Sequence, residues 1–422
     1  MPTSDFVRSL AKIQLHCHLE GTLREATFLE LARRHGVPTR YRPQSGALRE
    51  PPFDTLRMTG VEAQRAGEAQ RAGEAQHAGM DRRAGMDRRA GVDRRAEMAH
   101  RLGGVDGDLG EVEGQKGLVA AGSESAGGAY RFETFAEFLL TFAAVSRSLK
   151  DIQDYERLAA EYAADALAQR VVYGEVFISP SVWQFFHPTL DVRACVEAIR
   201  GAFDNARDSS GLELRLIVDL TRNFGIESAL RTAKLATELT DLGVIGIGLG
   251  GDEAKFPAAD YQEAFALARA HGLHCVAHAG EAAGAQSVRD AVELLRVERI
   301  GHGIRALDDP AVIELLAHRQ IPLEICPTSN FMTGVASRDR PHPLLELDAA
   351  GVLVTIDADD PALFDTSVTR EYEYVASLAG ETTLLRFVGN AVDASFAPES
   401  LKATIREDLR ASTLELDPAR RT

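Results

Sequence analysis

Residues 274–302 read HCVAHAGEAAGAQSVRDAVELLRVERIGH and contain two short apolar runs separated by a longer amphipathic one. The runs at 274–278 and 299–302 have the length of buried β-strands, whereas 287–298 repeats apolar residues at helical spacing. A strand, a helix and a second strand in this order predict a parallel strand pair joined by a crossover helix.

The same unit recurs along the chain. Another amphipathic segment lies at 261–272, and further apolar strands are expected at 12–16, 171–179, 212–220, 244–249, 321–326 and 352–357. Near-continuous apolar strands that alternate with helices are typical of a parallel sheet covered by helices. Eight strands are the number that closes a barrel, so we predict an α/β fold, the (β/α)8 TIM barrel. An open, doubly wound sheet is the alternative.

One segment interrupts this order after the first β/α unit. From Ala63 a six-residue motif repeats as AQRAGE, AQRAGE, AQHAGM, DRRAGM, DRRAGV and DRRAEM, and a glycine-rich stretch follows. Each glycine costs a helix about 1 kcal/mol, and apolar residues are too sparse to bury a face. We interpret 44–129 as a low-complexity, disordered insertion within a single domain spanning 1–422. A basic RNA-binding arm is the alternative, although Glu and Asp cancel most of its arginine charge.

The composition limits the partners. A net charge of −16 argues against nucleic acid and anionic membrane surfaces. The four cysteines lie far apart without C-x-x-C spacing, which suggests neither a disulfide framework nor a cysteine zinc site. The first residues lack the apolar core of a signal peptide, and no run approaches the ~18 apolar residues of a membrane span. We therefore expect a cytoplasmic protein with a small-molecule partner; the oligomeric state is left open.

Histidine and aspartate occur where several predicted strands end. His16 and His18 lie at the end of the first strand, His278 ends the fifth, and Asp359 follows the eighth. The carboxyl ends of barrel strands form the face where barrel active sites lie, and side chains two apart share a strand face. Zinc prefers imidazole and carboxylate ligands, and a catalytic zinc lowers the pKa of its bound water to about 7. The pattern predicts one zinc ion per subunit, held by these four residues.

Two further residues are expected to act on the reaction of that water. His302 ends the sixth strand between Gly301 and Gly303, and we expect it to orient the hydroxide as a base. Glu281 follows the fifth strand and can protonate the group to which hydroxide adds. The pattern therefore predicts a hydrolytic enzyme.

Six motifs then occur in a characteristic order: HCHLEGTLR, GDE at 251–253, HAGEAAG, RIGHG, CPTSN and DADDP. They closely resemble the motifs of the adenosine deaminase family, and the resemblance covers 7–43 and 130–400. It implies removal of the exocyclic amine of an adenine-type base, and zinc ligands identical to the four residues above. It also implies that Glu281 protonates a ring nitrogen and that His302 and Asp359 orient the hydroxide. Implied substrate contacts are His18, Glu20, the backbone amide of Gly251 at the other pyrimidine-ring nitrogen, and Asp360 at the imidazole side of the purine.

The motifs differ in the substrate that they favour within this family. Glu20 stands where typical adenosine deaminases have Asp, and it resembles the adenine deaminases. Asp252-Glu253 and the Gly-His-Gly around His302 have the nucleoside-deaminase form. The expected substrate is therefore adenosine or 2′-deoxyadenosine, converted to inosine or 2′-deoxyinosine and ammonia.

Aminodeoxyfutalosine, a nucleoside with an aromatic carboxylate in place of the 5′-hydroxyl, is the first alternative, and adenine is the second. An enlarged 5′ pocket would need apolar walls and a cation, and Trp183, Phe185 and Arg147 are candidates.

Two other classes of function remain open. A binuclear amidohydrolase usually bridges two metals with a carboxylated Lys or a Glu from its fourth strand, whereas Lys255 lies beyond that strand here. A non-catalytic nucleoside-binding protein would not need Glu281 and His302 beside an intact ligand set. A metal content of one equivalent rather than two would exclude the binuclear class.

Overall fold

The computed structural model describes residues 3–39, 128–132 and 134–416. They belong to one of the two units into which the chain divides, Met1–Leu56 with Gly128–Thr422. Eight parallel strands follow one another in sequence order: β1 Lys12–His18, β2 Val171–Ile178, β3 Glu213–Thr221, β4 Val244–Gly250, β5 His274–Ala279, β6 Arg299–His302, β7 Leu323–Ile325 and β8 Val354–Ile356. All eight predicted strands are therefore present.

The sheet closes on itself next to the functional site. An isolated parallel bridge joins Cys17 of β1 to Asp359, which follows β8. In this bridge His18 N donates to Asp359 O at 3.0 Å, and Asp359 N donates to His16 O at 3.1 Å. The predicted (β/α)8 barrel is confirmed, and the open doubly wound sheet is excluded.

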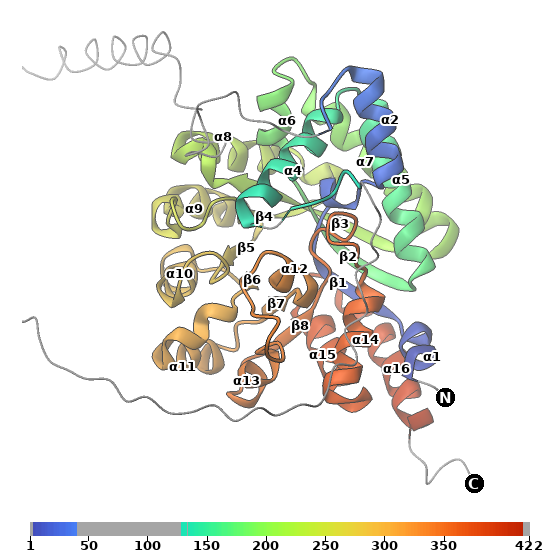
Figure 1. The fold of residues 1–422 in the computed structure, drawn as a ribbon, viewed down its shortest axis with the longest axis vertical. Helices are drawn as coiled ribbons and strands as arrows, with labels where there is room; N and C mark the ends of the chain where they lie inside the picture. Colours follow the sequence, from blue (N-terminus) through green and yellow to red (C-terminus); the bar gives the residue numbers. More distant parts are fainter. Residues whose placement is uncertain (1–2, 40–127, 133, 417–422) are drawn as a thin grey trace, which may run out of the picture. The chain divides into compact units, whose positions relative to one another are not determined.

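Helices surround the strands (Figure 1). The α-helices are α1 Thr3–Ser9, α2 Glu25–His35, α4 Phe135–Ser148, α5 Ile152–Ala168, α6 Pro180–Phe186, α7 Val192–Ser210, α8 Gly225–Glu238, α9 Gln262–Ala270, α10 Ala285–Asp290, α11 Pro310–Arg319, α12 Pro327–Met332, α13 Leu344–Ala349, α14 Val368–Ala379, α15 Glu381–Ala394 and α16 Glu399–Leu416. Short 3-10 turns are η1 Glu20–Thr22, η3 Arg222–Phe224, η4 Thr240–Leu242, η5 Ala258–Tyr261 and η7 Ile304–Asp308.

The helix expected over 287–298 is not regular throughout. Helix α10 continues into a π-helical turn, η6 Ala291–Leu295, and ends at Arg296, whose φ is +54°. Val297 N donates to Ala291 O and closes this last turn. A left-handed residue at a helix end satisfies carbonyl groups that regular helical bonds would leave free.

A small apolar cluster from three strands lies beneath the site. It consists of Phe177 of β2, Ile217 of β3 and Val276 of β5, all almost fully buried. The Phe177 ring lies 4.9 Å from the ring of His16 and 5.0 Å from that of His18. Strands that are apolar on both faces thus provide a packed floor for polar side chains at their carboxyl ends.

The predicted insertion at 44–129 falls outside the described residues, apart from its last two positions. Its disorder and the single-domain boundaries therefore stay predictions. Within the described part of the chain, no helix is long and apolar enough to cross a membrane.

Candidate active site

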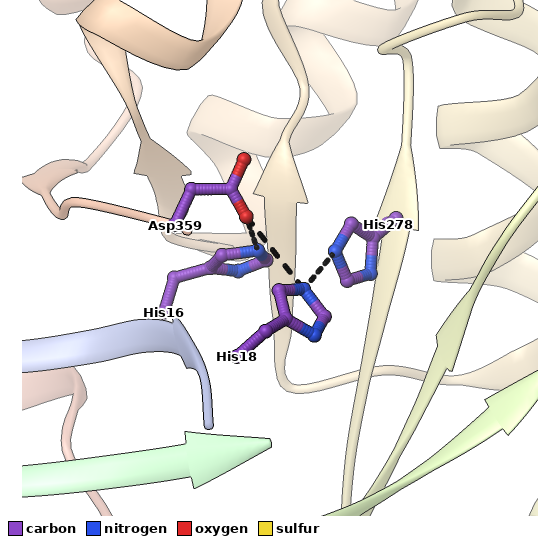
Figure 2. Close-up of side chains that lie close together, drawn as sticks. All are labelled: His16, His18, His278 and Asp359. Carbon is purple, nitrogen blue, oxygen red and sulfur yellow. Dashed lines mark hydrogen bonds and ion pairs between the residues drawn. The ribbon is translucent and has the colours of Figure 1, made fainter. Parts of the chain in front are cut away.

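Four side chains converge at the carboxyl ends of β1, β5 and β8 (Figure 2). They are His16, His18, His278 and Asp359, and their ligand atoms all lie within 4.8 Å of one another. His18 Nε2 is 3.1 Å from His278 Nε2. Asp359 Oδ1 is 3.5 Å from His16 Nε2 and 3.6 Å from His18 Nε2. The structure thus brings together the four residues that the sequence suggested as metal ligands.

The Nδ1 atoms of His16 and His278 form hydrogen bonds, which leaves the Nε2 atoms of these two rings with lone pairs directed toward the candidate metal position. His16 Nδ1 lies 2.7 Å from Glu324 Oε2, and His278 Nδ1 lies 3.2 Å from the Leu249 carbonyl oxygen. A neutral ring that donates from Nδ1 has no proton on Nε2. His16 Nε2 is buried without a hydrogen-bond partner. One unpaired acceptor and two facing imidazole nitrogens beside a carboxylate fit a cation, and this donor set suits a divalent metal.

Two of the three imidazoles have the neutral form that metal binding requires. Burial lowers the pKa of His18 to about 3 and that of His278 well below its ordinary value, so both rings are neutral at neutral pH. Histidine binds a metal in its neutral form. Although burial lowers it, hydrogen bonds to Asp359 and Glu324 raise the pKa of His16 well above its ordinary value, so His16 must lose a proton to bind a metal.

A buried ion network holds His16 from below. Arg299 of β6 forms ion pairs with Glu324 of β7 and with Glu175 of β2, and all three side chains are at most 1% exposed. Although burial raises the pKa of Glu324, Arg299 and His16 lower it below its usual range, so this carboxylate accepts the Nδ1–H of His16. The sequence analysis missed this network. Its signal is a charged residue inside otherwise apolar strands, as in RIGH and LEIC.

Two site residues have a left-handed backbone that is uncommon outside glycine. The φ angle is +62° at Asp359 and +61° at His302. The bonds that tie Asp359 to β1 keep it in this conformation. Strain of this kind concentrates at functional sites, because the surrounding structure must hold it in place.

Glu281 is buried and firmly positioned. The carboxylate of Glu253 accepts hydrogen bonds from four successive backbone amides of its loop, those of residues 280 to 283, at 2.6–3.0 Å. Burial, followed by the nearby Asp359 and Glu253 carboxylates, raises the pKa of Glu281 well above its ordinary value. The raised pKa favours the protonated form of Glu281, which is the form that a general acid requires. The sequence analysis used Glu253 only to compare substrate types and missed its part in fixing this loop.

His302 lies beside both acids. Its Nε2 is 3.7 Å from Glu281 Oε1 and 3.8 Å from Asp359 Oδ2. Its Nδ1 is 3.1 Å from Asn330 Nδ2, and Asn330 Oδ1 is 3.0 Å from His342 Nε2. This series of hydrogen bonds ends at the backbone amide of Leu344, which donates to His342 Nδ1 at 3.2 Å.

The Leu344 backbone amide determines the proton positions on the other members of this series of hydrogen bonds, because an amide N–H can only donate. His342 Nδ1 must accept, so its proton is on Nε2, and Asn330 Oδ1 accepts it. The Asn330 amide nitrogen then donates to His302 Nδ1, and the remaining proton of His302 is on Nε2, facing the site. Burial lowers the pKa of His342 to about 3, which agrees with its neutral form.

Substitution of Asn330 by aspartate tests this arrangement. A carboxylate can only accept, so it draws a proton to His302 Nδ1; we expect kcat to fall about 10- to 100-fold, the usual cost of losing such a partner. The dependence of kcat and KM on pH and the 15N chemical shifts of His302 measure the change. His342→Gln is the matched control, because its side-chain N–H can still donate to Asn330; it should retain activity within about threefold. Equal losses in the two variants would show that these residues only fill space.

A cavity opens above the four candidate ligands. It is lined by His18, Phe135, Phe138, Leu139, Phe142, Ser179, Val182, Asp219, Thr221, Asn223, Gly250, Gly251, His278, Glu281, His302, Asp359 and Asp360. Asp360 Oδ1 is buried without a partner. Gly21 leaves the space for this carboxylate, because a Cβ on Gly21 would lie 1.8 Å from that oxygen.

Glu20 and the proposed 5′-pocket residues lie differently. Glu20 is fully buried, does not line the cavity, and accepts hydrogen bonds from Ser179 N at 2.9 Å and Trp183 Nε1 at 2.6 Å. Neither Trp183, Phe185 nor Arg147 lines the cavity. The apolar wall is formed instead by Phe135, Phe138, Leu139 and Phe142 of α4, together with Val182. The four α4 residues recur at i, i+3, i+4 and i+7, which places them on one face of a helix, so this apolar face could have been predicted from the sequence.

A barrel with a candidate cation site at the carboxyl ends of its strands, and a buried acid of raised pKa beside that site, is typical of a metal-dependent hydrolase that acts on a small molecule in its cleft. A family model described as adenosine deaminase matches residues 119–412. The chain belongs to this family. It is an aminohydrolase that deaminates an adenine-type substrate.

Individual relatives have two different named activities. An adenine deaminase of Rhizobium leguminosarum bv. trifolii is 36% identical over 308 residues, covering 72% of this chain and 95% of the relative. An aminodeoxyfutalosine deaminase of Streptomyces coelicolor is 38% identical over 284 residues, covering 66% of this chain and 73% of the relative. The solved structure of an amidohydrolase from Burkholderia ambifaria with bound Zn matches at a TM-score of 0.70 and 23% identity, covering 99% of this chain and 96% of that chain.

Proposed function

We propose that the chain deaminates an adenine nucleoside that bears an aromatic group at its 5′ position, the class to which aminodeoxyfutalosine, with its aromatic carboxylate, belongs. The observation that carries this proposal is the aromatic wall of the cavity. The Phe142 ring lies 6.1 Å from the ring of His18, and Phe138 and Phe135 continue the wall outward along α4. Seven residues of helix span about 10 Å. An apolar surface of this length suits a hydrophobic extension better than a bare sugar.

In the proposed reaction, water adds across the C6–N1 bond of the purine, with its oxygen on C6. The proton that Asp359 takes from the water passes to N6, so the C6–N6 bond breaks and ammonia leaves, while the C6 hydroxyl returns a proton to Glu281 and becomes the carbonyl. His16, His18, His278 and Asp359 would hold zinc, which lowers the pKa of a bound water so that hydroxide is available near neutral pH. Glu281 gives its proton to the ring nitrogen beside C6.

The remaining residues orient the reactants. The Nε2–H of His302 donates to the attacking oxygen, and Asp359 Oδ2, 3.8 Å from that nitrogen, accepts the proton of the water. This assignment differs from the base expected of His302 on sequence grounds, because Asn330 already occupies its free lone pair. Gly251 N and Asp360 hold the two other edges of the purine, as the family resemblance implies.

Free adenine is the second candidate. It is favoured by the adenine deaminase relative at 36% identity and by Glu20, which has the form found in adenine deaminases. The aromatic wall would then have no ligand group to contact. Adenosine itself, the substrate expected from the sequence, has no support among the named activities of these relatives.

A substrate panel tests the proposal. We expect aminodeoxyfutalosine to exceed adenosine, 2′-deoxyadenosine and adenine in kcat/KM by at least about tenfold, because filling an apolar pocket contributes about 1–3 kcal/mol. AMP should be deaminated at least about 100-fold less efficiently than adenosine. The described lining includes neither Lys nor Arg, so it offers no cation to pair with a phosphate. A highest kcat/KM with adenine would overturn the proposal in favour of the second candidate.

A further inference from the structure

Two polar atoms of the cavity have no role in the reaction above. Asp219 Oδ1 and Asn223 Nδ2 are buried without a hydrogen-bond partner, and both residues line the cavity. Asp219 is 4% exposed and Asn223 is 8% exposed. The same condition holds for His16 Nε2, which faces the cation site, and for Asp360 Oδ1, which faces the purine in the proposed function. Burying an unpaired polar group costs free energy, so these two atoms also call for a ligand.

Both side chains are fixed in place. Asp219 of β3 lies against two glycines of β4: a Cβ on Gly248 would be 2.7 Å from Asp219 Oδ1, and one on Gly250 would be 2.4 Å from Asp219 Oδ2. Asn223 Oδ1 accepts from Asp252 N at 3.0 Å, so its amide is oriented with Nδ2 free to donate. The strand VIGIGLG thus leaves room for a carboxylate, and the next loop orients the amide.

The location of the pair relates it to one part of the substrate. Asn223 packs against Gly251, because a Cβ on Gly251 would lie 2.3 Å from Asn223 Oδ1. In the proposed function Gly251 N binds the pyrimidine-ring nitrogen N3. In a purine, N3 and the sugar-bearing N9 are joined to the same carbon, so the sugar leaves the base on the side where Asn223 and Asp219 lie.

The chemistry of the pair suits a sugar. An acceptor and a donor side by side match hydroxyl groups, which both donate and accept. Burial, followed by the nearby Glu20 carboxylate, raises the pKa of Asp219 to about 8. A carboxyl group with this pKa is largely protonated near neutral pH, so it can both donate a hydrogen bond to a hydroxyl group and accept one from it.

We propose that Asp219 and Asn223 form the sugar subsite, in which Asp219 accepts a hydrogen bond from a ribose hydroxyl and Asn223 Nδ2 donates to the same or the neighbouring hydroxyl. This inference rests on the proposed function, in that it assumes a nucleoside substrate. It makes Asp219 a specificity-determining residue that distinguishes a nucleoside from the free base.

The test is a cycle that removes the protein group and the substrate group separately and together. For Asp219→Ala we expect kcat/KM with adenosine to fall about 10- to 100-fold, the cost of leaving a buried hydroxyl group without a hydrogen-bond partner. The value with adenine should change less than about threefold. Either 2′-deoxyadenosine or 3′-deoxyadenosine should already be poor with the wild type and lose little more in the variant. Asp252→Asn is the control: this carboxylate is on the adjoining loop but does not line the cavity, so it should leave the adenosine-to-adenine ratio unchanged.

The outcomes separate this inference from the function on which it rests. Equal losses for adenosine, both deoxynucleosides and adenine would overturn the sugar subsite while leaving nucleoside deamination intact. Activity of the wild type on adenine and on no nucleoside would overturn the proposed function itself. If Asp219→Ala does not fold, Asp219→Asn keeps the side-chain volume and should show the same order of substrates with smaller losses; a uniform loss would again reject the subsite.

Discussion

Replacing Glu281 by glutamine is expected to lower kcat by at least about 100-fold while the metal content stays near one equivalent, because losing a general acid typically costs 10²–10⁴ in rate. Glutamine preserves the size of the side chain and its place in the loop held by Glu253. It cannot transfer a proton to the purine. A group needed only as the reaction proceeds affects kcat and kcat/KM together, so KM should change little.

The pH profile adds an independent test of this role. A general acid acts in its protonated form, and burial together with two neighbouring carboxylates raises the pKa of Glu281, which favours that form. The wild-type rate should therefore fall as pH rises through this pKa, and that limb should be absent in Glu281→Gln. Glu253→Gln is the matched control, because it weakens the loop bonds but keeps the acid. The fall in rate should remain in this variant and move to lower pH, because the Glu253 carboxylate raises the pKa of Glu281. Near-normal turnover in a folded Glu281→Gln protein would rule out the general-acid role.

Replacing His278 by alanine should remove both metal and activity, whereas His302→Ala should retain much of the metal and lose most of the rate. These residues end neighbouring strands, and their rings lie 5.4 Å apart, so the two variants perturb the same region to a similar extent. The two residues differ in the surroundings of their Nε2 atoms. The Nε2 of His278 lies 3.1 Å from His18 Nε2, whereas the Nε2 of His302 lies near the carboxylates of Glu281 and Asp359.

The measurement is metal content by mass spectrometry after dialysis, together with kcat/KM and thermal unfolding. One equivalent in the wild type would also exclude a binuclear centre. If His302→Ala loses metal as completely as His278→Ala, His302 belongs among the ligands and its role as a hydrogen-bond donor to the attacking oxygen is wrong.

The sequence by itself determined the barrel and the residues near its catalytic face. Each strand is a short apolar run, and the length and spacing of its apolar residues identify it as a strand. The strands at 12–16 and 299–302 could therefore be recognised without knowing which elements they pack against. Once eight strands are parallel, residues at their carboxyl ends must lie at the same end of the barrel. The convergence of His16, His278 and Asp359 at one end of the barrel was therefore predictable, although they lie far apart along the chain.

Tertiary structure alone decided how these side chains are protonated, supported and surrounded. The proton on His302 depends on Asn330, His342 and the Leu344 amide, and no local pattern relates them. The direction of Glu20, bonded to Trp183, and the unpaired Asp219 likewise depend on packing between elements. The physical reason is range: periodicity is set by neighbours along the chain, whereas hydrogen-bond partners, burial and pKa are set by groups that meet only when the barrel closes.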